Sequence, residues 1–106
     1  MYSQKKEACP VKKSLDLLSG KWKLRIVEEM RRESRRFGEL KKRIDGISEK
    51  MLIQELKYLT EQGLLHRKAY PEIPPKVEYS LTDRGRETLP IIDQLIHFGK
   101  GILDDK

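Results

Sequence analysis

Cysteine is almost absent from this chain, which carries a single one, Cys9, among 106 residues. A lone thiol excludes an internal disulfide and any metal site built from several cysteines. Histidine is also scarce, and His66 and His97 lie too far apart in the sequence to show metal-ligand spacing. We therefore expect no metal ion and no cofactor, and the lack of disulfides favours the cytoplasm, where thiols stay reduced.

Long apolar runs and catalytic motifs are missing as well. No stretch approaches the ~20 apolar residues that a membrane-spanning helix needs. The N-terminal "MYSQKKEACP" lacks the apolar centre of a secretory signal. The sequence contains neither a glycine-rich phosphate loop nor a nucleophile motif. These absences predict a cytoplasmic protein that has no membrane partner and is not an enzyme.

Charge is abundant and biased to one sign. Charged residues make up 38% of the chain and hydrophobic residues 37%, which is enough for one core in a single domain. The formal net charge is +6 and the isoelectric point is about 9.5. This excess favours a polyanionic partner, most simply a nucleic acid. A soluble, lysine-rich surface explains the same excess.

Hydrophobic spacing predicts four helices in the first part of the chain, over residues 10–18, 21–32, 35–44 and 48–62. Residues 1–8, which precede them, are polar and are expected to form a flexible arm. The predicted buried faces consist of Leu18, Trp22, Ile26, Val27, Met30, Phe37, Leu40, Ile44, Leu52, Leu56 and Leu59.

After Gly63 the pattern changes to that of a hairpin. Two short segments with strand-forming residues, 64–70 and 76–81, flank the proline-rich "PEIPP", which indicates a stiff loop. Thr82 then begins a last helix, which Pro90 is expected to kink. The whole chain is therefore predicted to be an α+β protein, mostly α.

The order of these segments is that of a winged helix-turn-helix. Two consecutive helices joined by the tight, glycine-containing turn "DGI" are the helix-turn-helix signature, and a hairpin directly after the second helix is the wing. We expect helix 48–62 to enter the DNA major groove as the recognition helix. The wing, residues 64–81, would lie on the flanking backbone or in the minor groove. A generic small α+β domain is the alternative.

The predicted DNA-reading face of the recognition helix points away from its leucine stripe. Glutamine can pair bidentately with adenine, lysine with guanine, and apolar atoms can touch a thymine methyl group. A serine at the helix N-terminus suits a phosphate. The residues concerned are Ser48, Lys50, Met51, Ile53, Gln54 and Lys57. An ordinary solvated helix face has a similar composition, so other basic groups are needed to support this interpretation.

Two further segments supply such groups. Arg35 and Arg36 are expected to open the helix that crosses the DNA backbone, and Lys41 follows within it. Lys68 and Lys76 flank the hairpin loop, where a wing tip would meet DNA. Three segments thus offer basic side chains to what should be one DNA-binding surface.

Several stretches together resemble the HxlR family of bacterial transcription regulators, which are relatives of the MarR-type winged-helix proteins. These stretches are the Cys-Pro start, "GKW", "RRFGEL", "GISEKML" and "YPEIPPKVEYSLT", and the match spans most of residues 9–106, the predicted domain. The resemblance implies a homodimer in which the N- and C-terminal helices form the interface, and a palindromic operator in double-stranded DNA. The expected interface residues are Val11, Leu15, Leu89, Ile92, Leu95, Ile96, Phe98 and Ile102.

The resemblance also implies a role for Cys9, because family members respond to oxidants or electrophiles through a cysteine in this position. The expected place of Cys9 at a helix N-terminus, next to Lys12 and Lys13, would favour its reactive thiolate. Because the chain has no second cysteine, the remaining forms of redox sensing are a Cys9–Cys9′ disulfide, a mixed disulfide or alkylation by a thiol-reactive effector. Inert packing is the alternative.

Together these observations predict a homodimeric, sequence-specific DNA-binding transcriptional regulator that senses redox state through Cys9. Members of the family that it resembles repress or activate neighbouring genes, and repression is the role predicted here. The alternative function is a basic RNA- or protein-binding module without sequence-specific DNA recognition.

Overall fold

The computed structural model describes residues 9–105. The predicted flexible arm, residues 1–8, lies outside this range, as does the last residue of the predicted domain. The secondary-structure elements, in chain order, are α1 (Pro10–Leu18), α2 (Lys23–Glu28), β1 (Arg35–Arg36), α3 (Phe37–Arg43), α4 (Glu49–Glu61), β2 (Leu65–Tyr70), β3 (Lys76–Leu81), α5 (Asp83–Arg86) and α6 (Leu89–Asp104).

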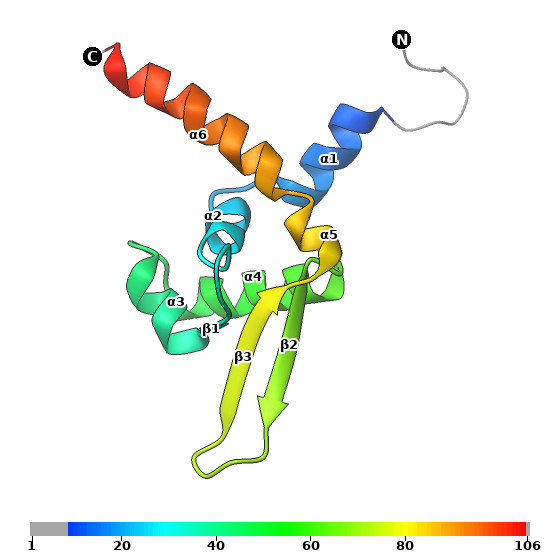
Figure 1. The fold of residues 1–106 in the computed structure, drawn as a ribbon, viewed down its shortest axis with the longest axis vertical. Helices are drawn as coiled ribbons and strands as arrows, with labels where there is room; N and C mark the ends of the chain where they lie inside the picture. Colours follow the sequence, from blue (N-terminus) through cyan, green and yellow to red (C-terminus); the bar gives the residue numbers. More distant parts are fainter. Residues whose placement is uncertain (1–8, 106) are drawn as a thin grey trace.

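The molecule has a compact centre with two kinds of projection. Figure 1 shows α2, α3 and α4 in the centre, the β2–β3 hairpin extending from one end, and α1 and α6 diverging at the other. The three strands form one antiparallel sheet in the order β1-β3-β2. Its register pairs Leu65 with Leu81 and Tyr70 with Lys76 in the hairpin, and Arg35 with Tyr79 at the edge. The hairpin is therefore the wing of a winged helix.

Local sequence signals explain most element ends. Pro10 is the first residue of α1, where its missing N–H costs no hydrogen bond. Ser48 caps α4, because its Oγ accepts a hydrogen bond from the Met51 N–H at 3.1 Å. Thr82 caps α5 in the same way, accepting from the Gly85 N–H at 3.0 Å. The predicted bounds of α1, α4, β2 and β3 agree with the structure to within one or two residues.

One hydrophobic core joins the helices to the base of the wing. Each large apolar side chain buried there contributes roughly 1.5–3 kcal/mol, so this core supplies most of the stability that holds the wing and helices together. All of the predicted core residues except Phe37 are buried, and Phe37 packs against the core while half-buried. The remaining members are Ile47, Leu64, Leu65, Leu81 and Ile92.

Two predicted helices are longer than the real ones. The helix expected over 21–32 ends at Glu28, and turns over the following residues carry the chain into β1. The helix expected over 35–44 starts only at Phe37, because Arg35 and Arg36 pair with β3 as a strand. The expectation that both arginines open a helix was therefore wrong for Arg35, whereas Arg36 ends the strand and is the N-cap residue of α3. Strand pairing with a segment about forty residues away leaves no periodic signal in so short a stretch.

The last predicted helix is in fact two. α5 ends at Arg86, the chain bends, and α6 starts at Leu89. Pro90 therefore lies in the first turn of α6 and produces no kink. The short α5 packs tightly against the loop after α4, since a Cβ added at Gly85 would lie only 2.2 Å from the Leu64 carbonyl oxygen.

Candidate nucleic-acid interface

The predicted recognition helix, α4, presents a polar face to solvent. Its leucines Leu52, Leu56 and Leu59 are buried in the core. On the opposite side Lys50, Ile53, Gln54 and Lys57 are exposed, while Met51 is half-buried against the core. Five of the six predicted DNA-contacting residues, Ser48 among them, are therefore exposed on α4 or at its start. The sixth, Met51, exposes only part of its side chain.

The turn between α3 and α4 fixes the angle of the recognition helix. Gly46 has a φ of +87°, a conformation that side chains disfavour, and the Trp22 ring packs beneath it. Ile44 and Ile47 on either side are both buried. These contacts place the N-terminus of α4 at the surface, where unpaired N–H groups can hold a phosphate.

The basic residues of β1 and α3 divide into two groups. Arg36 and Lys41 are exposed, as predicted for contacts to DNA phosphates. Arg35 differs, because its side chain is only 14% exposed and pairs with Glu33 at 3.5 Å. Its Nε also donates to the Glu29 carbonyl at 2.8 Å. The structure therefore gives Arg35 the role of holding the α2–β1 connection in place.

Contacts between aromatic and charged side chains join the two strands of the wing. The Tyr70 hydroxyl donates to Glu78 at 3.0 Å, and Lys76 pairs with Glu78 at 3.4 Å. The hydrogen bond from Tyr70, and then the pairing with Lys76, lower the pKa of Glu78. The ammonium groups of Lys68 and Lys76 lie 5.0 and 4.7 Å from the centre of the Tyr70 ring. Lys68 remains exposed, whereas Lys76 is only 24% exposed and has an anionic partner.

The end of the molecule opposite the wing is apolar. Six of the eight predicted interface residues are exposed there: Val11, Leu15, Leu95, Ile96, Phe98 and Ile102. Ile92 was misplaced, because it is 5% exposed and belongs to the protein's own core. Leu89 is half-buried against that core and keeps part of its side chain accessible. Ile91 and Leu103 are exposed although they were not predicted. Helical spacing could have identified Ile91, which shares a stripe with Leu95, Phe98 and Ile102.

Cys9 lies at the N-cap of α1 with an extended backbone, and it is partly exposed. Its carbonyl accepts the first helical hydrogen bond, from the Lys13 N–H at 2.9 Å. Lys12 pairs with Asp16 at 2.9 Å. The hydrogen bond to Asp16 is the largest cause of the raised pKa of Lys12, and the charge of Cys9 is a smaller one. The predicted placement of Cys9 at a helix start is therefore confirmed.

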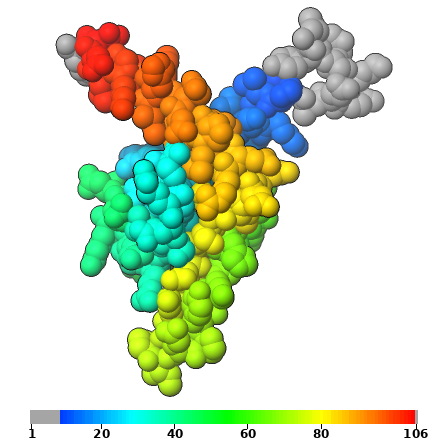
Figure 2. All heavy atoms as spheres, viewed as in Figure 1, coloured from blue at the N-terminus to red at the C-terminus, as the bar shows by residue number. Residues whose placement is uncertain are grey.

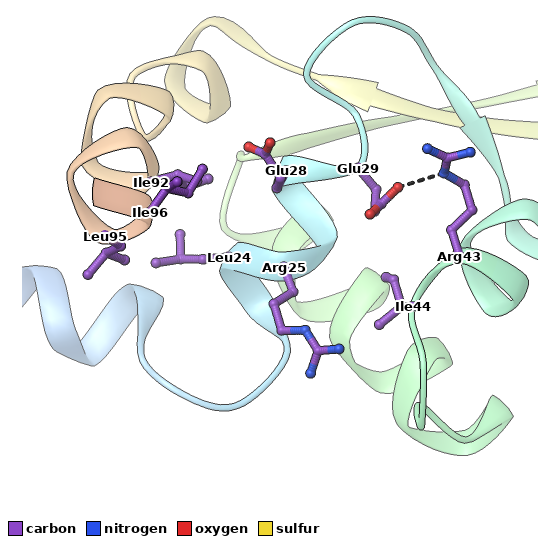
Figure 3. Close-up of a pocket in the computed structure, with 9 residues that line it drawn as sticks. All are labelled: Leu24, Arg25, Glu28, Glu29, Arg43, Ile44, Ile92, Leu95 and Ile96. Carbon is purple, nitrogen blue, oxygen red and sulfur yellow. Dashed lines mark hydrogen bonds and ion pairs between the residues drawn. The ribbon is translucent and has the colours of Figure 1, made fainter. Parts of the chain in front are cut away.

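An open groove of about 310 Å³ separates α6 from α2 and α3. Its apolar lining comes from Leu24, Ile44, Ile92, Leu95 and Ile96. Figure 3 shows Leu24 of α2 opposite the side chains of α6, with an ion pair between Glu29 and Arg43 at the far side. That pair spans 2.6 Å, and its hydrogen bond raises the pKa of Arg43.

Comparison with known proteins decides among the candidate functions. A family model described as HxlR-like helix-turn-helix matches residues 17–106. The chain belongs to this HxlR-like family. The uncharacterized HTH-type transcriptional regulator YdzF of Bacillus subtilis is 46% identical over 91 residues, covering 85% of this chain and 84% of YdzF.

Solved structures agree with this assignment. A protein from Porphyromonas gingivalis W83, described as a transcriptional regulator of the MarR family, is similar with a TM-score of 0.86 and 52% identity. That match covers 94% of this chain and 96% of the other. The redox regulator HypR in its reduced form has a TM-score of 0.85 and 37% identity, covering 92% of this chain and 100% of HypR.

This HxlR-like protein is therefore a transcriptional regulator of the helix-turn-helix type, with the predicted winged-helix fold. The prediction that it is not an enzyme is confirmed by the family, whose members are regulators. Among residues 9–105, no helix is long and apolar enough to cross a membrane. In the same part of the chain, no group of three or more His, Cys, Asp or Glu residues could hold a metal ion.

Proposed function

We propose that this regulator is a cytoplasmic homodimer that binds a palindromic operator in double-stranded DNA and represses transcription. The observation that carries this proposal is the separation of two exposed surfaces. The basic, polar surface of α3, α4 and the hairpin lies at one end of the molecule, and the apolar surface of α1 and α6 lies at the other (Figure 1). Such a division suits a protein that reads DNA with one end and pairs with its copy through the other.

In this proposal α4 enters the major groove and the wing reaches the flanking backbone or minor groove. Gln54 and Lys50 are the residues that discriminate bases, with Ile53 and Met51 next to them and Lys57 farther along the helix. Ser48 at the start of α4, with Arg36 and Lys41 before it, binds phosphates. On the wing, Lys68 is the main phosphate contact, since Lys76 shares its charge with Glu78.

The homodimer follows from the exposed apolar side chains. Phe98, Leu95 and Ile102 lie on one stripe of α6 together with Ile91, and Val11 and Leu15 of α1 are exposed as well. Figure 2 shows both helices projecting from the centre of the molecule. A 9-residue helix such as α1 is marginal in water on its own. Burial of α1 and α6 against a second copy would stabilise both helices and hold two recognition helices at a fixed separation.

The proposed sensing site is Cys9, the one thiol of the chain. Cys9 is partly exposed as a residue, and its position at the start of α1 couples it to the dimer surface. HypR, to which the chain is similar, is named as a redox regulator and has been solved in reduced and oxidised forms. A thiol-reactive effector that modifies Cys9, or a Cys9–Cys9′ disulfide, would therefore change the dimer and with it DNA binding.

Binding measurements on duplexes selected from random DNA test the proposal. The wild-type protein should enrich one palindromic sequence, with log affinity falling by about 0.9 per neutralised phosphate for each unit of log salt. Gln54→Ala removes one base contact in each half-site, at about 1.4 kcal/mol per contact, so it should lower the affinity of the dimer for that sequence about 100-fold and relax its preference at one base pair in each half-site. Lys68→Ala should weaken binding to all duplexes alike. Tighter binding to single-stranded RNA than to any duplex would support the rival RNA-binding module.

A further inference from the structure

Only the beginning of α6 is attached to the rest of the protein. Ile92 is buried and Leu89 is half-buried, whereas the apolar residues from Leu95 onward are exposed. The second half of α6 projects away from the centre (Figures 1 and 2). The direction of α6 is therefore decided within its first two turns.

The side of α6 that faces α2 is not completely packed. The groove of about 310 Å³ lies between α6 and α2, with Leu24 on one wall and Leu95 and Ile96 on the other (Figure 3). Close packing normally fixes the angle between two helices, and along this groove the contact between α2 and α6 is incomplete, so Leu89 and Ile92 alone constrain the tilt of α6 only in part. Another contact must hold the angle.

Arg31 makes that contact. It follows α2, and its NH2 group donates to the Asp93 carboxylate of α6 at 2.6 Å. Its Nε and NH2 groups also donate to Glu28, at 3.1 and 2.9 Å, and Glu28 lines the groove. Among residues 9–105 this is the one ion pair that joins α6 to the rest of the protein. One guanidinium thus connects the end of α2 to the second turn of α6, next to the buried Ile92.

We propose that the Arg31–Asp93 bridge sets the angle between α6 and the DNA-reading part of the protein, and thereby the half-site spacing that the dimer prefers. A rotation of about 10° displaces a point about 20 Å away by about 3.5 Å, close to the rise of one base pair. With two α6 helices paired across a dimer, both recognition helices move by this amount. Arg31 and Asp93 are positioning residues, and the inference rests on the proposed dimer and its operator.

The first test measures spacing preference. Duplexes carry the half-sites selected by the wild-type protein, with the selected central spacing or with one base pair added or removed. The wild type should prefer the selected spacing at least tenfold, and Asp93→Asn should reduce that preference to threefold or less. The exchange Arg31→Glu with Asp93→Arg should restore most of it, since it keeps a pair of opposite charges between the same two positions. Glu29→Gln, which breaks the 2.6 Å pair with Arg43 inside the DNA-reading part, is the matched control and should leave the preference unchanged.

A second measurement needs no DNA. Spin labels at Gln62→Cys in a Cys9→Ser background report the distance between the two α4 helices by dipolar spectroscopy. Asp93→Asn should shift or broaden this distance by several ångströms, and the exchanged pair should return it. An unchanged spacing preference together with an unchanged distance would overturn the inference while leaving the proposed function intact. A wild-type protein that gives no intersubunit signal would overturn the dimer and the inference with it.

Discussion

Replacing Phe98 with alanine should weaken the dimer without lowering the stability of the folded monomer. Phe98 is 68% exposed, so it contributes little to the protein's own core. A phenylalanine side chain presents about 200 Å², so roughly 140 Å² remains for a partner to cover, equivalent to about 3 kcal/mol. Alanine keeps part of this area, and we expect a loss of about 2 kcal/mol per subunit. Both subunits carry the change, which raises the dimer dissociation constant about 1,000-fold.

Sedimentation velocity over a dilution series measures this dissociation constant directly. Ile73→Ala is the matched control, because Ile73 is fully exposed and belongs to the loop between β2 and β3. The β2–β3 hairpin extends from the opposite end of the molecule to α6 (Figure 1). This substitution should leave the dimer unchanged. At concentrations low enough for both proteins to be monomeric, thermal unfolding of Phe98→Ala should match that of the wild type, because only the dimer adds stability. If Phe98→Ala dimerises as tightly as the wild type, α6 is not the dimer surface and the assignment fails.

Three further predictions concern the core, the α5 packing and the thiol. Ile92→Ala removes a buried side chain and should lower the free energy of unfolding by about 2–4 kcal/mol in urea titration; a loss below about 0.5 kcal/mol would place Ile92 outside the core. Gly85→Ala forces a methyl group against the Leu64 carbonyl oxygen and should cost about 2 kcal/mol or more in the same titration. Gly38→Ala, which has open space around it, should be neutral or slightly stabilising. Diamide should abolish operator binding by the wild type and spare Cys9→Ser; an equal response of both proteins would exclude Cys9 as the sensor.

Much of the fold was predictable because short-range signals agree with it. Pro10, Ser48 and Thr82 mark helix starts by their backbone and capping chemistry, and the leucine stripe of α4 identifies its buried face. The β2–β3 hairpin follows from strand-forming segments on both sides of a proline-rich loop. In each case, residues close in the sequence determine the structure.

The errors arose where distant segments meet. Arg35 and Arg36 form β1 only because β3 lies beside them, and Arg35 turns inward because Glu29 offers it a carbonyl. Ile92 looks like any other apolar residue of α6, but it lies where that helix still contacts the core. The sequence likewise shows charged residues at 31 and 93 without indicating that they meet. Such pairings depend on tertiary structure, which periodicity does not report.

The comparison of a selected duplex with its scrambled version tests the central claim most directly. Fluorescence anisotropy at about 150 mM salt gives both affinities under conditions where non-specific contacts are weak. The wild type should bind the selected duplex as a dimer at least 1,000-fold more tightly, and Gln54→Ala, which removes one base contact in each half-site, should reduce that preference about 100-fold. Equal affinity of the wild type for the two duplexes would contradict sequence-specific recognition by α4.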